Sequence, residues 1–272
     1  MTTSHSTVRR TAGAAVAVLT LLLAAGCAAR GEEGTSTIRA PKLVKDGSLT
    51  VCTDMPYAPF ESMKGGEPVG FDIDLVREVA SELGLTLDVV DTDFDAIQSG
   101  DALNSDSCDV AISAMTITGE RARVLDFSSP YFNASQALVV NKGSGLDSLD
   151  ALAGLRVGVQ GGTTGELYLT DNAPASAKVM PLEDAAAMGD ALETGVVDAA
   201  VYDNTVVGDV VASNPDLEVS TEFDTGEQYG MAVKKDGNVD LLRTINDVLA
   251  TLKRDGGYDK IYTTWFGTAP AQ

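Results

Sequence analysis

Short apolar runs alternate with helical patterns along the first half of the chain beyond about residue 48. The runs at 49–53, 85–90 and 109–115 are typical of buried strands. Between the first two, apolar residues recur at helical spacing from Phe71 and stop at Gly84, and a second helix is expected at 94–103. Strand and helix in this alternation predict an α/β fold with a parallel sheet covered on both faces.

The alternation pauses at 128–132 and then resumes. The later strand-like runs are 136–140, 155–159, 197–202 and 229–233, and the later helical patterns are 164–169, 183–193 and 241–252. Two sets of βα units separated by a break predict two lobes, with the chain returning to the first lobe at its end. We expect the first lobe at 47–133 and 230–268 and the second at 136–227.

The first 26 residues have the layout of an export signal. Arg9 and Arg10 precede an apolar stretch of about 15 residues, which is shorter than the roughly 20 residues of a membrane span. The stretch ends at Ala24-Ala25-Gly26-Cys27, which resembles the bacterial lipoprotein cleavage pattern, although Ala24 stands where a larger aliphatic residue is usual. We expect a lipidated Cys27 that anchors the protein to the outer face of the cell membrane. The alternative is an ordinary export signal followed by an incidental cysteine.

Residues 27–46 mix small and polar residues with little periodicity, which suits a flexible tether between the lipid and the folded part. Removal of residues 1–26, which carry two arginines and no acidic side chain, changes the formal charge from −21 to −23. So acidic a chain is not expected to bind nucleic acid or to adhere electrostatically to anionic lipid.

The single histidine, His5, lies in the segment that we expect to be removed. The remaining chain therefore lacks the imidazole of Ser-His and Cys-His nucleophile pairs and of the usual zinc sites, and we expect no metal, no cofactor and no catalysis. Cys52 and Cys108 form an even pair in an oxidising compartment, which suggests a disulfide. Two separately buried thiols are the alternative.

Polar residues gather where the predicted strands end. Ligands of open parallel sheets bind beyond the carboxyl ends of the strands. Four strand ends from two lobes can therefore converge on one cleft. The residues at these ends are Asp54, Ser113 with Thr116, the loop 161–164, and Asp203.

The chemistry of these residues suits an α-amino acid. The guanidinium of Arg121 and the backbone donors of the glycine-rich loop at 161–165 match a carboxylate, and Asp203 with nearby hydroxyls matches an ammonium. Each residue also has a simpler interpretation. Thr118 and Asp203 are plausible helix caps, Arg121 would then be a solvated residue of a first turn, and the aromatic residues Tyr57, Phe60 and Phe94 are more often core.

Taken together, the motifs resemble the family of extracellular solute-binding proteins that serve amino-acid ABC importers. The resemblance spans roughly residues 49–267. The matching pieces are Tyr57-Ala58-Pro59-Phe60, Gly70-Phe71-Asp72-Ile73-Asp74-Leu75, Cys108-Asp109-Val110, Met115-Thr116-Ile117-Thr118 with Arg121, Phe127-Ser128-Ser129-Pro130-Tyr131, Arg156-Val157-Gly158-Val159-Gln160, Gly162-Thr163-Thr164-Gly165, Val197-Asp198-Ala199 with Asp203, and Trp265-Phe266-Gly267.

The resemblance implies a two-lobed clamshell of the periplasmic-binding-protein-like type II, with strand-like crossings near 133–137 and 226–231. Arg121 would bind the ligand carboxylate together with backbone N–H groups of Thr116 and Thr164. The implied ammonium ligands are Ser113, Thr116 and Asp203, the implied side-chain neighbours are Tyr57 and Phe94, and the remaining implied contacts are Ala114, Gly162 and Thr163. Ala114 and Gly165 depart from residues that relatives often carry, so fewer contacts to the ligand side chain are expected.

The resemblance also implies partners: an amino acid, and a membrane permease with its ATPase, served by a monomeric binding protein. Asp54, with Glu61 or Asp95, could meet a cationic side chain, which favours a basic amino acid narrowly over glutamine, glutamate or cystine. Two other functions occur on the same fold: a periplasmic dehydratase of aromatic amino acid synthesis and the sensor lobe of a receptor.

Overall fold

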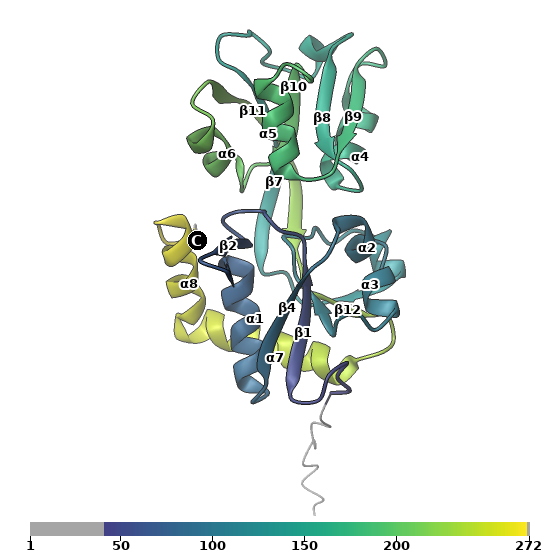
Figure 1. Cartoon of the computed structure of the whole chain (residues 1–272), viewed down its shortest axis with the longest axis vertical. Helices are drawn as coiled ribbons and strands as arrows, with labels where there is room; N and C mark the ends of the chain where they lie inside the picture. The colour runs from purple at the N-terminus through teal and green to yellow at the C-terminus, as the bar shows by residue number, and fades with distance from the viewer. Residues whose placement is uncertain (1–40, 271–272) are drawn as a thin grey trace, which may run out of the picture. The chain divides into compact units, whose positions relative to one another are not determined.

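The computed structural model describes residues 41–270 (Figure 1). The predicted export signal, Cys27 and the tether up to residue 40 lie outside these residues. No helix within 41–270 combines the length and the hydrophobicity that a membrane crossing requires.

The first lobe is built on a five-stranded sheet in the order β4-β1-β5-β12-β6. β4 and β5 pair with β1 in parallel, whereas β12 pairs with β5 and β6 in antiparallel fashion. The parallel pairs of β1 are the predicted ones. The single antiparallel strand, β12, comes from chain that returns after the second lobe and lies between β5 and β6. The bounds are β1 (Ser48–Thr53), β4 (Thr86–Asp91), β5 (Val110–Ala111), β6 (Leu125–Phe127) and β12 (Ala232–Lys234).

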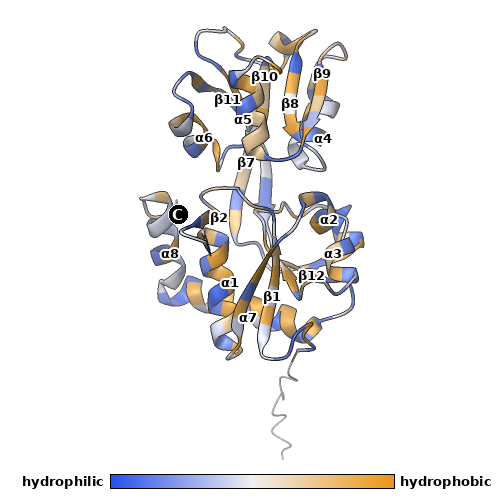
Figure 2. Cartoon of the chain, in the orientation of Figure 1, coloured by the Kyte–Doolittle hydropathy of each residue, from blue (hydrophilic) through white to orange (hydrophobic). Residues whose placement is uncertain are grey.

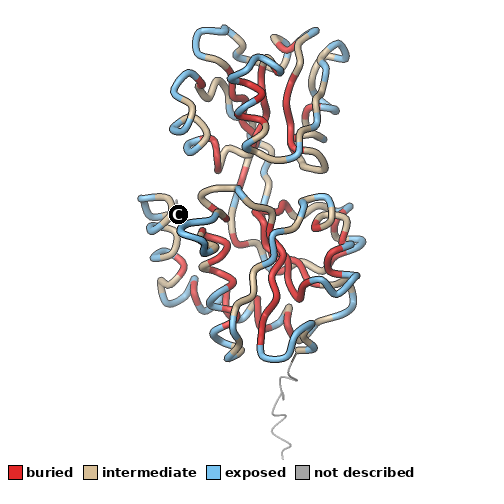
Figure 3. Tube along the Cα trace, in the orientation of Figure 1, coloured by how far each residue is buried: buried red, intermediate tan, exposed pale blue. Residues whose placement is uncertain are grey.

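Helices cover both faces of this sheet because both sets of alternating side chains are apolar. Val51 and Val110 pack with the buried residues of one face, while Cys52 and Ala111 belong to the cluster of the other face. The helices of the first face are α1 (Phe71–Glu82) and α7 (Val239–Asp255), and those of the second are α2 (Phe94–Gln98) and α3 (Asp101–Asn104). β1, inside the sheet, is buried along its whole length, whereas β4 at the edge is exposed or half-buried (Figure 3).

The second lobe repeats this plan with the order β11-β7-β10-β8-β9. β8 pairs in parallel with β9 and β10, and β7 pairs antiparallel with β10 and β11. α4 packs on one face against Val157 and Val201, and α5 packs on the other with Ala200. The inner strands of both sheets are largely hydrophobic, whereas β11 at the edge of the second sheet is largely polar (Figure 2). The bounds are β7 (Phe132–Asn141), β8 (Arg156–Gln160), β9 (Lys178–Leu182), β10 (Ala199–Asp203), β11 (Leu217–Tyr229), η2 (Asp150–Leu152), α4 (Thr164–Asn172), α5 (Ala185–Glu193) and α6 (Val207–Ser213).

Two long strands connect the lobes (Figure 1). β7 leaves the first lobe and β11 returns to it, and they pair along most of their length. At the crossing, Phe132 lies opposite Tyr229 and Ala134 opposite Glu227, with a register shift between Phe223 and Glu227. Both crossings fall where the resemblance placed them.

Several elements differ from the prediction. The helix expected at 94–103 is broken by Gly100, which adopts a left-handed φ of 82°, and the strand expected at 109–115 is ordered as a strand only at Val110–Ala111. A hairpin, β6, β9, η2, α6, the part of β11 before residue 226 and the last helix were not predicted. The bounds of those not yet given are β2 (Ser62–Lys64), β3 (Glu67–Val69) and α8 (Gly257–Phe266).

The last helix is held by a motif contact that spans the chain. Trp265 of α8 donates its indole N–H to Asp74 of α1 at 2.8 Å, so two pieces of the family resemblance touch each other. Phe266 also packs against Phe60 and Phe71 at centroid distances of 5.5 and 5.4 Å. α8 therefore closes the aromatic core of the first lobe.

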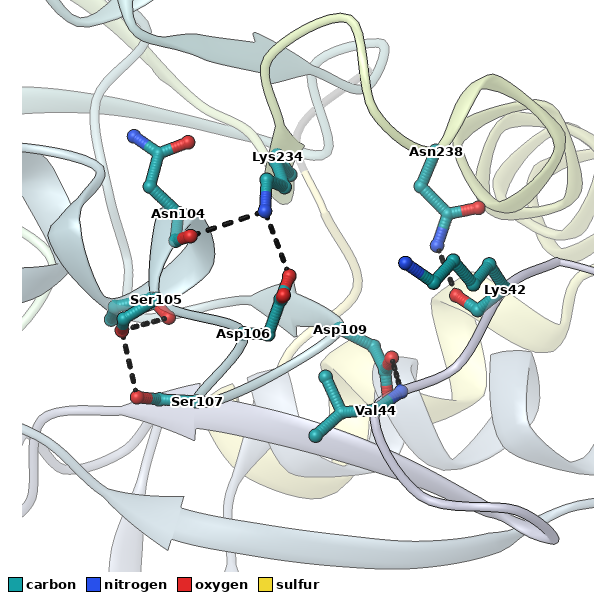
Figure 4. A network of polar contacts seen from close by, with 10 residues as sticks. Lys42, Val44, Asn104, Ser105, Asp106, Ser107, Asp109, Lys234 and Asn238 are labelled. Atoms are coloured by element: carbon teal, nitrogen blue, oxygen red, sulfur yellow. Dashed lines mark hydrogen bonds and ion pairs between the residues drawn. The ribbon is translucent and has the colours of Figure 1, made fainter.

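Side chains of the first lobe hold the backbone of the chain that enters it (Figure 4). Val44 N donates to Asp109 Oδ1 at 2.7 Å, and Asn238 donates to the carbonyl of Lys42 at 2.9 Å. Next to this contact, Cys52 and Cys108 are joined by a disulfide with a Cα–Cα distance of 5.7 Å. The entry point of the chain is thus tied to β1 and β5.

Candidate ligand-binding site

A cavity of about 30 Å³ lies between the two lobes, at the carboxyl ends of β1, β5, β8 and β10. It has room for about two water molecules, which is less than a larger ligand needs. All the predicted ligand-binding residues line it except Gly162. The lining residues are Asp54, Tyr57, Phe94, Ser113, Ala114, Thr116, Arg121, Gln136, Gln160, Thr163, Thr164, Gly165, Ala185, Met188, Val201, Tyr202 and Asp203.

Arg121 supplies a buried positive charge to this cavity. It begins the short helix η1 (Arg121–Arg123), and its side chain is buried, with the whole residue 5% exposed. The guanidinium donates to the carbonyl of Thr116 at 2.8 Å and to that of Gly162 at 3.0 Å, and it lies 5.1 Å from the centre of the Phe94 ring. Thr118 does accept a hydrogen bond from the Arg121 N–H, but the side chain is not solvated as that simpler interpretation required.

The charge of Arg121 lacks a direct counter-ion. Among residues 41–270 the ion pairs within 4.0 Å are formed by other cations. Burial lowers the pKa of Arg121 to about 10, while Asp203 and Glu227 act in the opposite direction from a distance, so the group stays protonated at neutral pH. A buried guanidinium bonded to carbonyls alone is suited to receive a carboxylate.

The N-terminus of α4 faces Arg121 from the second lobe. Thr163 caps this helix by accepting from the N–H of Glu166, and Thr164 follows as the first helical residue. Gly162, with φ of 71°, donates its N–H to Glu166 Oε2 at 2.9 Å and offers its carbonyl to Arg121. The structure therefore places Gly162 behind the cavity wall, where its carbonyl orients Arg121, and places the first helical residues, Thr164 and Gly165, on the cavity wall.

Asp203 supplies a negative charge from the second lobe. It ends β10, and its carboxylate accepts from Gln136 Nε2 at 2.7 Å and from the hydroxyl of Tyr229. The adjacent N–H, that of Asn204, is bonded to Ser135 O, so Asp203 does not cap it. Burial raises the pKa of Asp203 to about 6, and the nearby charge of Glu227 acts in the same direction.

Glu227 is a site residue that the sequence analysis missed. Its Oε2 accepts from the hydroxyls of Thr116, in the first lobe, and Thr164, in the second, both at 2.6 Å, and its Oε1 accepts from Gln136 at 2.9 Å and Thr225 at 2.8 Å. Burial raises the pKa of Glu227, but these hydrogen bonds outweigh it and leave the pKa below its usual value. An ionised carboxylate on β11 thus joins both lobes behind the cavity.

A further direct link between the lobes joins Gln160 to Asp54 on the cavity wall. Gln160, at the end of β8, donates to Asp54 Oδ2 at 2.7 Å, and burial raises the pKa of Asp54 to about 6. Asp54 and Phe94 also line an adjoining acidic hollow, which is where Asp95 lies. The other acidic residues of this hollow are Asp91, Asp93, Glu183 and Asp184.

The remaining predicted side chains are divided between wall and core. Tyr57 lines the cavity, whereas Phe60 is fully buried in the aromatic core. Glu61, expected as a partner for a cationic ligand, is also fully buried and lies behind Ser113, to which it is hydrogen-bonded. An apolar wall from the second lobe was not predicted: Ala185, Met188, Val201 and Tyr202.

Two glutamines missed by the sequence analysis organise the charges of the site. Gln136 Nε2 bridges the carboxylates of Asp203 and Glu227, and Gln160 bridges the lobes through Asp54. Their position in the sequence could have identified them, because each glutamine lies at an end of an apolar strand run. Both are buried in the structure. No group of three or more potential metal ligands forms within the described part of the chain.

Comparison with known proteins agrees with this architecture. The chain is 32% identical to the ABC transporter glutamine-binding protein GlnH of Bacillus subtilis, over 95% of this chain and 97% of that protein. It is 35% identical to ABC transporter arginine-binding protein 1 of Escherichia coli, over 77% and 87%. Among solved structures, an ancestral arginine-binding protein bound to arginine superposes with a TM-score of 0.77, at 44% identity, covering 81% of this chain and 98% of that one.

The sequence profile of one family matches residues 49–268, which include every strand and helix of the two lobes apart from the first residue of β1. The chain belongs to the bacterial extracellular solute-binding proteins, family 3.

Proposed function

We propose that this protein is the substrate-binding component of an ABC importer and that it binds a cationic amino acid between its lobes. The observation that carries the proposal is the placement of Arg121 and Asp203 on one cavity from opposite lobes. A zwitterion presents opposite charges on its two α-substituents, and only a receptor with both signs on one cleft matches it.

The α-carboxylate would bind Arg121 and the N–H groups of Thr116 and Thr164. The guanidinium already has two carbonyl contacts and a ring beneath it, so its orientation is set before the ligand arrives. The α-ammonium would bind Asp203 and Ser113, whose oxygen atoms face the same cavity. These assignments require no chemical change in the ligand.

The charge of the site favours a ligand with a cationic side chain. The ionisable residues on the cavity wall are Asp54, Arg121 and Asp203, two acids and one base, and Glu227 adds a further negative charge behind the wall. A zwitterion with a neutral side chain leaves this negative excess unchanged. A guanidinium or ammonium side chain directed to Asp54 and the acidic hollow would reduce it.

Binding would be coupled to closure of the lobes. Two strands connect the lobes, and the proposed ligand groups come from both sides of the cleft, so a ligand would interact fully only with the closed form. We propose that the closed form is then recognised by a membrane permease with its ATPase, that the protein acts as a monomer, and that a lipidated Cys27 holds it at the outer face of the membrane.

A thermal-shift screen of the twenty amino acids tests this function. A ligand that binds only the folded state at about 100 times its Kd adds about 2.7 kcal/mol to the stability, which raises the melting temperature. We expect arginine or lysine to give the largest increase and glutamine a smaller one. The absence of a shift with every amino acid would contradict the proposal.

A dehydratase is the alternative function, and one observation favours it. Asp54 and Asp203 are buried carboxyl groups with pKa values raised to about 6, which is a property of acid catalysts. Both are hydrogen-bonded by glutamine side chains, which stabilises their ionised forms. We expect no turnover when the protein is incubated with prephenate or arogenate. Product formation would establish the enzyme instead.

A further inference from the structure

Two carboxyl groups that do not line the cavity are buried directly behind it. Glu61 and Asp72 are both 0% exposed, in a lobe whose other acidic side chains lie mostly at the surface. Burial of two acids in one place is unfavourable unless they have a specific arrangement, because each would be ionised in water. Glu61 is hydrogen-bonded to Ser113 and Asp72 to Ala114, two neighbouring residues of the cavity wall.

The backbone brings the two acids together through a glycine. Gly70 has φ of 148°, and a Cβ atom there would lie 1.8 Å from the carbonyl oxygen of Phe60. This close approach allows Asp72 N to donate to Phe60 O at 3.1 Å, directly before Glu61 in the chain. The first turn of α1 and the segment at Glu61 are therefore locked side by side.

Glu61 fixes the direction of the Ser113 hydroxyl. Ser113 Oγ donates its only hydrogen to Glu61 Oε1 at 2.9 Å, and it accepts from the N–H of Asp54 at 3.1 Å. With its hydrogen engaged, the hydroxyl can act only as an acceptor toward the cavity. An acceptor is what an ammonium group requires.

Asp72 fixes the next residue of the cavity wall. Its Oδ2 accepts from the N–H of Ala114 and from the hydroxyl of Tyr131, both at 2.8 Å. Ala114 has φ of 41°, a left-handed conformation that is unfavourable for a residue with a Cβ atom. The hydrogen bond to Asp72 stabilises this turn and directs the Ala114 N–H away from the cavity. An N–H that pointed into the cavity would repel an ammonium.

One proton shared between the two carboxyl groups would give a hydrogen bond to the carboxyl oxygen of each residue that still lacks one. Glu61 Oε2 and Asp72 Oδ1 have no hydrogen-bond donor among the described residues, although the two carboxyl groups are within hydrogen-bonding reach. Burial raises the pKa of Glu61 well above its usual range and that of Asp72 to about 7. A proton held by Glu61 and donated to Asp72 satisfies both oxygens and removes the repulsion between them.

We propose that Glu61 and Asp72 are positioning residues for the ligand's α-ammonium, and that their single shared proton keeps Ser113 an acceptor toward the cavity. The inference rests on the proposed amino-acid function and identifies the residues that set the polarity of its ammonium subsite. Neither carboxyl group touches the ligand in this account.

Amide substitutions test the arrangement because they fix the hydrogen positions. In Glu61→Gln the amide N–H replaces the shared proton, and in Asp72→Asn the amide donates to an ionised Glu61, so each single variant should bind L-arginine within about threefold of the wild type. In the double variant two amide nitrogens would face each other, and rotation of residue 61 would turn its N–H toward Ser113. Ser113 would then point its hydrogen into the cavity, and affinity should fall at least tenfold.

Ligand selectivity separates this role from a loss of stability. The wild type should prefer L-arginine strongly over its α-hydroxy acid analogue, in which a hydroxyl replaces the ammonium, and the double variant should lose most of that preference. Asp74→Asn is the matched control, because Asp74 lies on the same helix. Its carboxylate accepts hydrogen bonds from Trp265 of α8 and from Arg77, both away from the cavity. It should change the melting temperature without changing selectivity. An unchanged preference in a folded double variant would overturn the proposal.

Infrared spectroscopy tests the shared proton without any ligand. The wild type at neutral pH should show the carbonyl stretch of a buried protonated carboxyl group, and the band should disappear in Glu61→Gln. If the spectra are the same, the pair does not hold a proton and the inference fails. If no amino acid binds the wild type, the proposed function fails, and the spectra still decide whether the proton is shared.

Discussion

The side-chain amide of Gln160 lies 2.7 Å from the carboxylate of Asp54 across the cleft. Gln160 is the last residue of β8 and Asp54 directly follows β1, so the contact joins the two sheets at the carboxyl ends of these strands. Asp54 also faces both the cavity and the acidic hollow. We therefore expect it to have two partners in turn: Gln160 in the structure described here and a cationic side chain in the complex.

Replacement of Asp54 should alter selectivity more than stability. In Asp54→Asn the neutral amide can still interact with Gln160, but the attraction for a cationic side chain is lost. We expect affinity for arginine to fall about tenfold, or about 1.4 kcal/mol, with a change of less than threefold for glutamine. Titration calorimetry with both amino acids measures this, and Asp101→Asn, which removes an exposed charge on α3 away from the cavity and the hollow, is the control. Equal losses for both ligands would place Asp54 away from the side chain.

Glu227 should hold the lobes together in the absence of ligand. Glu227→Gln keeps the shape of the side chain but removes the charge that accepts from Thr116 and Thr164. Hydrogen bonds to a charged group contribute about 1.5–3 kcal/mol, so the variant should populate more open forms and bind ligand more weakly. Small-angle X-ray scattering of the ligand-free protein should give a larger radius of gyration for the variant. The same radius for both proteins would show that Glu227 does not join the lobes.

Ligand binding should weaken as the pH falls from about 7.5 to about 5. Burial raises the pKa values of Asp54 and Asp203 to about 6, so over this interval both become protonated and lose their attraction for a cationic amino acid. The stability of the ligand-free protein should change in the opposite direction and increase as the pH falls. Because the folded state binds these protons more tightly than the unfolded state, the two groups contribute most stability below about pH 4 and least above about pH 6.

Calorimetric titrations across this pH range, together with thermal melts of the free protein, measure both trends. In Asp203→Asn the decrease in affinity with falling pH should be smaller, since only Asp54 still titrates on the cavity wall. Affinity that increases toward pH 5 would contradict the assignment of these carboxylates to the ligand's positive groups.

The Cys52–Cys108 disulfide should contribute stability but not affinity. It closes a loop with a sequence separation of 56, for which chain entropy gives about 4 kcal/mol, and native-state effects commonly reduce this to about 2–4 kcal/mol. The double variant Cys52→Ala/Cys108→Ala should unfold at lower denaturant concentration, yet bind ligand within about twofold. A large loss of affinity in the folded variant would mean that the disulfide positions Asp54 or Ser113.

The main strands and helices were predictable because their side chains follow simple periods. Val51 and Cys52 alternate between two apolar faces, and the stretch from Phe71 repeats at helical spacing. The strand ends then located Asp54, Ser113, Thr164 and the residues near them on one cleft. Ligand sites of parallel sheets follow from topology, so this part of the site is visible in the sequence.

The missed parts depend on contacts that no local pattern records. β11 was not predicted because its residues alternate between exposed and half-buried positions and include several acids, as in a polar loop. Glu227 and Gln136 became site residues only through hydrogen bonds with each other and with both lobes. Gly162 was assigned to the ligand from its loop, whereas its N–H is taken by Glu166 within the same turn.

We expect Arg121 to bind the carboxylate of an amino acid held between the lobes. Titration calorimetry of the wild type and Arg121→Ala with L-arginine and L-argininamide, which lacks the carboxylate, measures this contact. The wild type should bind argininamide far more weakly than arginine, whereas Arg121→Ala should lose about 2–5 kcal/mol for arginine and no longer distinguish the two ligands. If Arg121→Ala binds arginine as tightly as the wild type does, Arg121 does not hold the carboxylate.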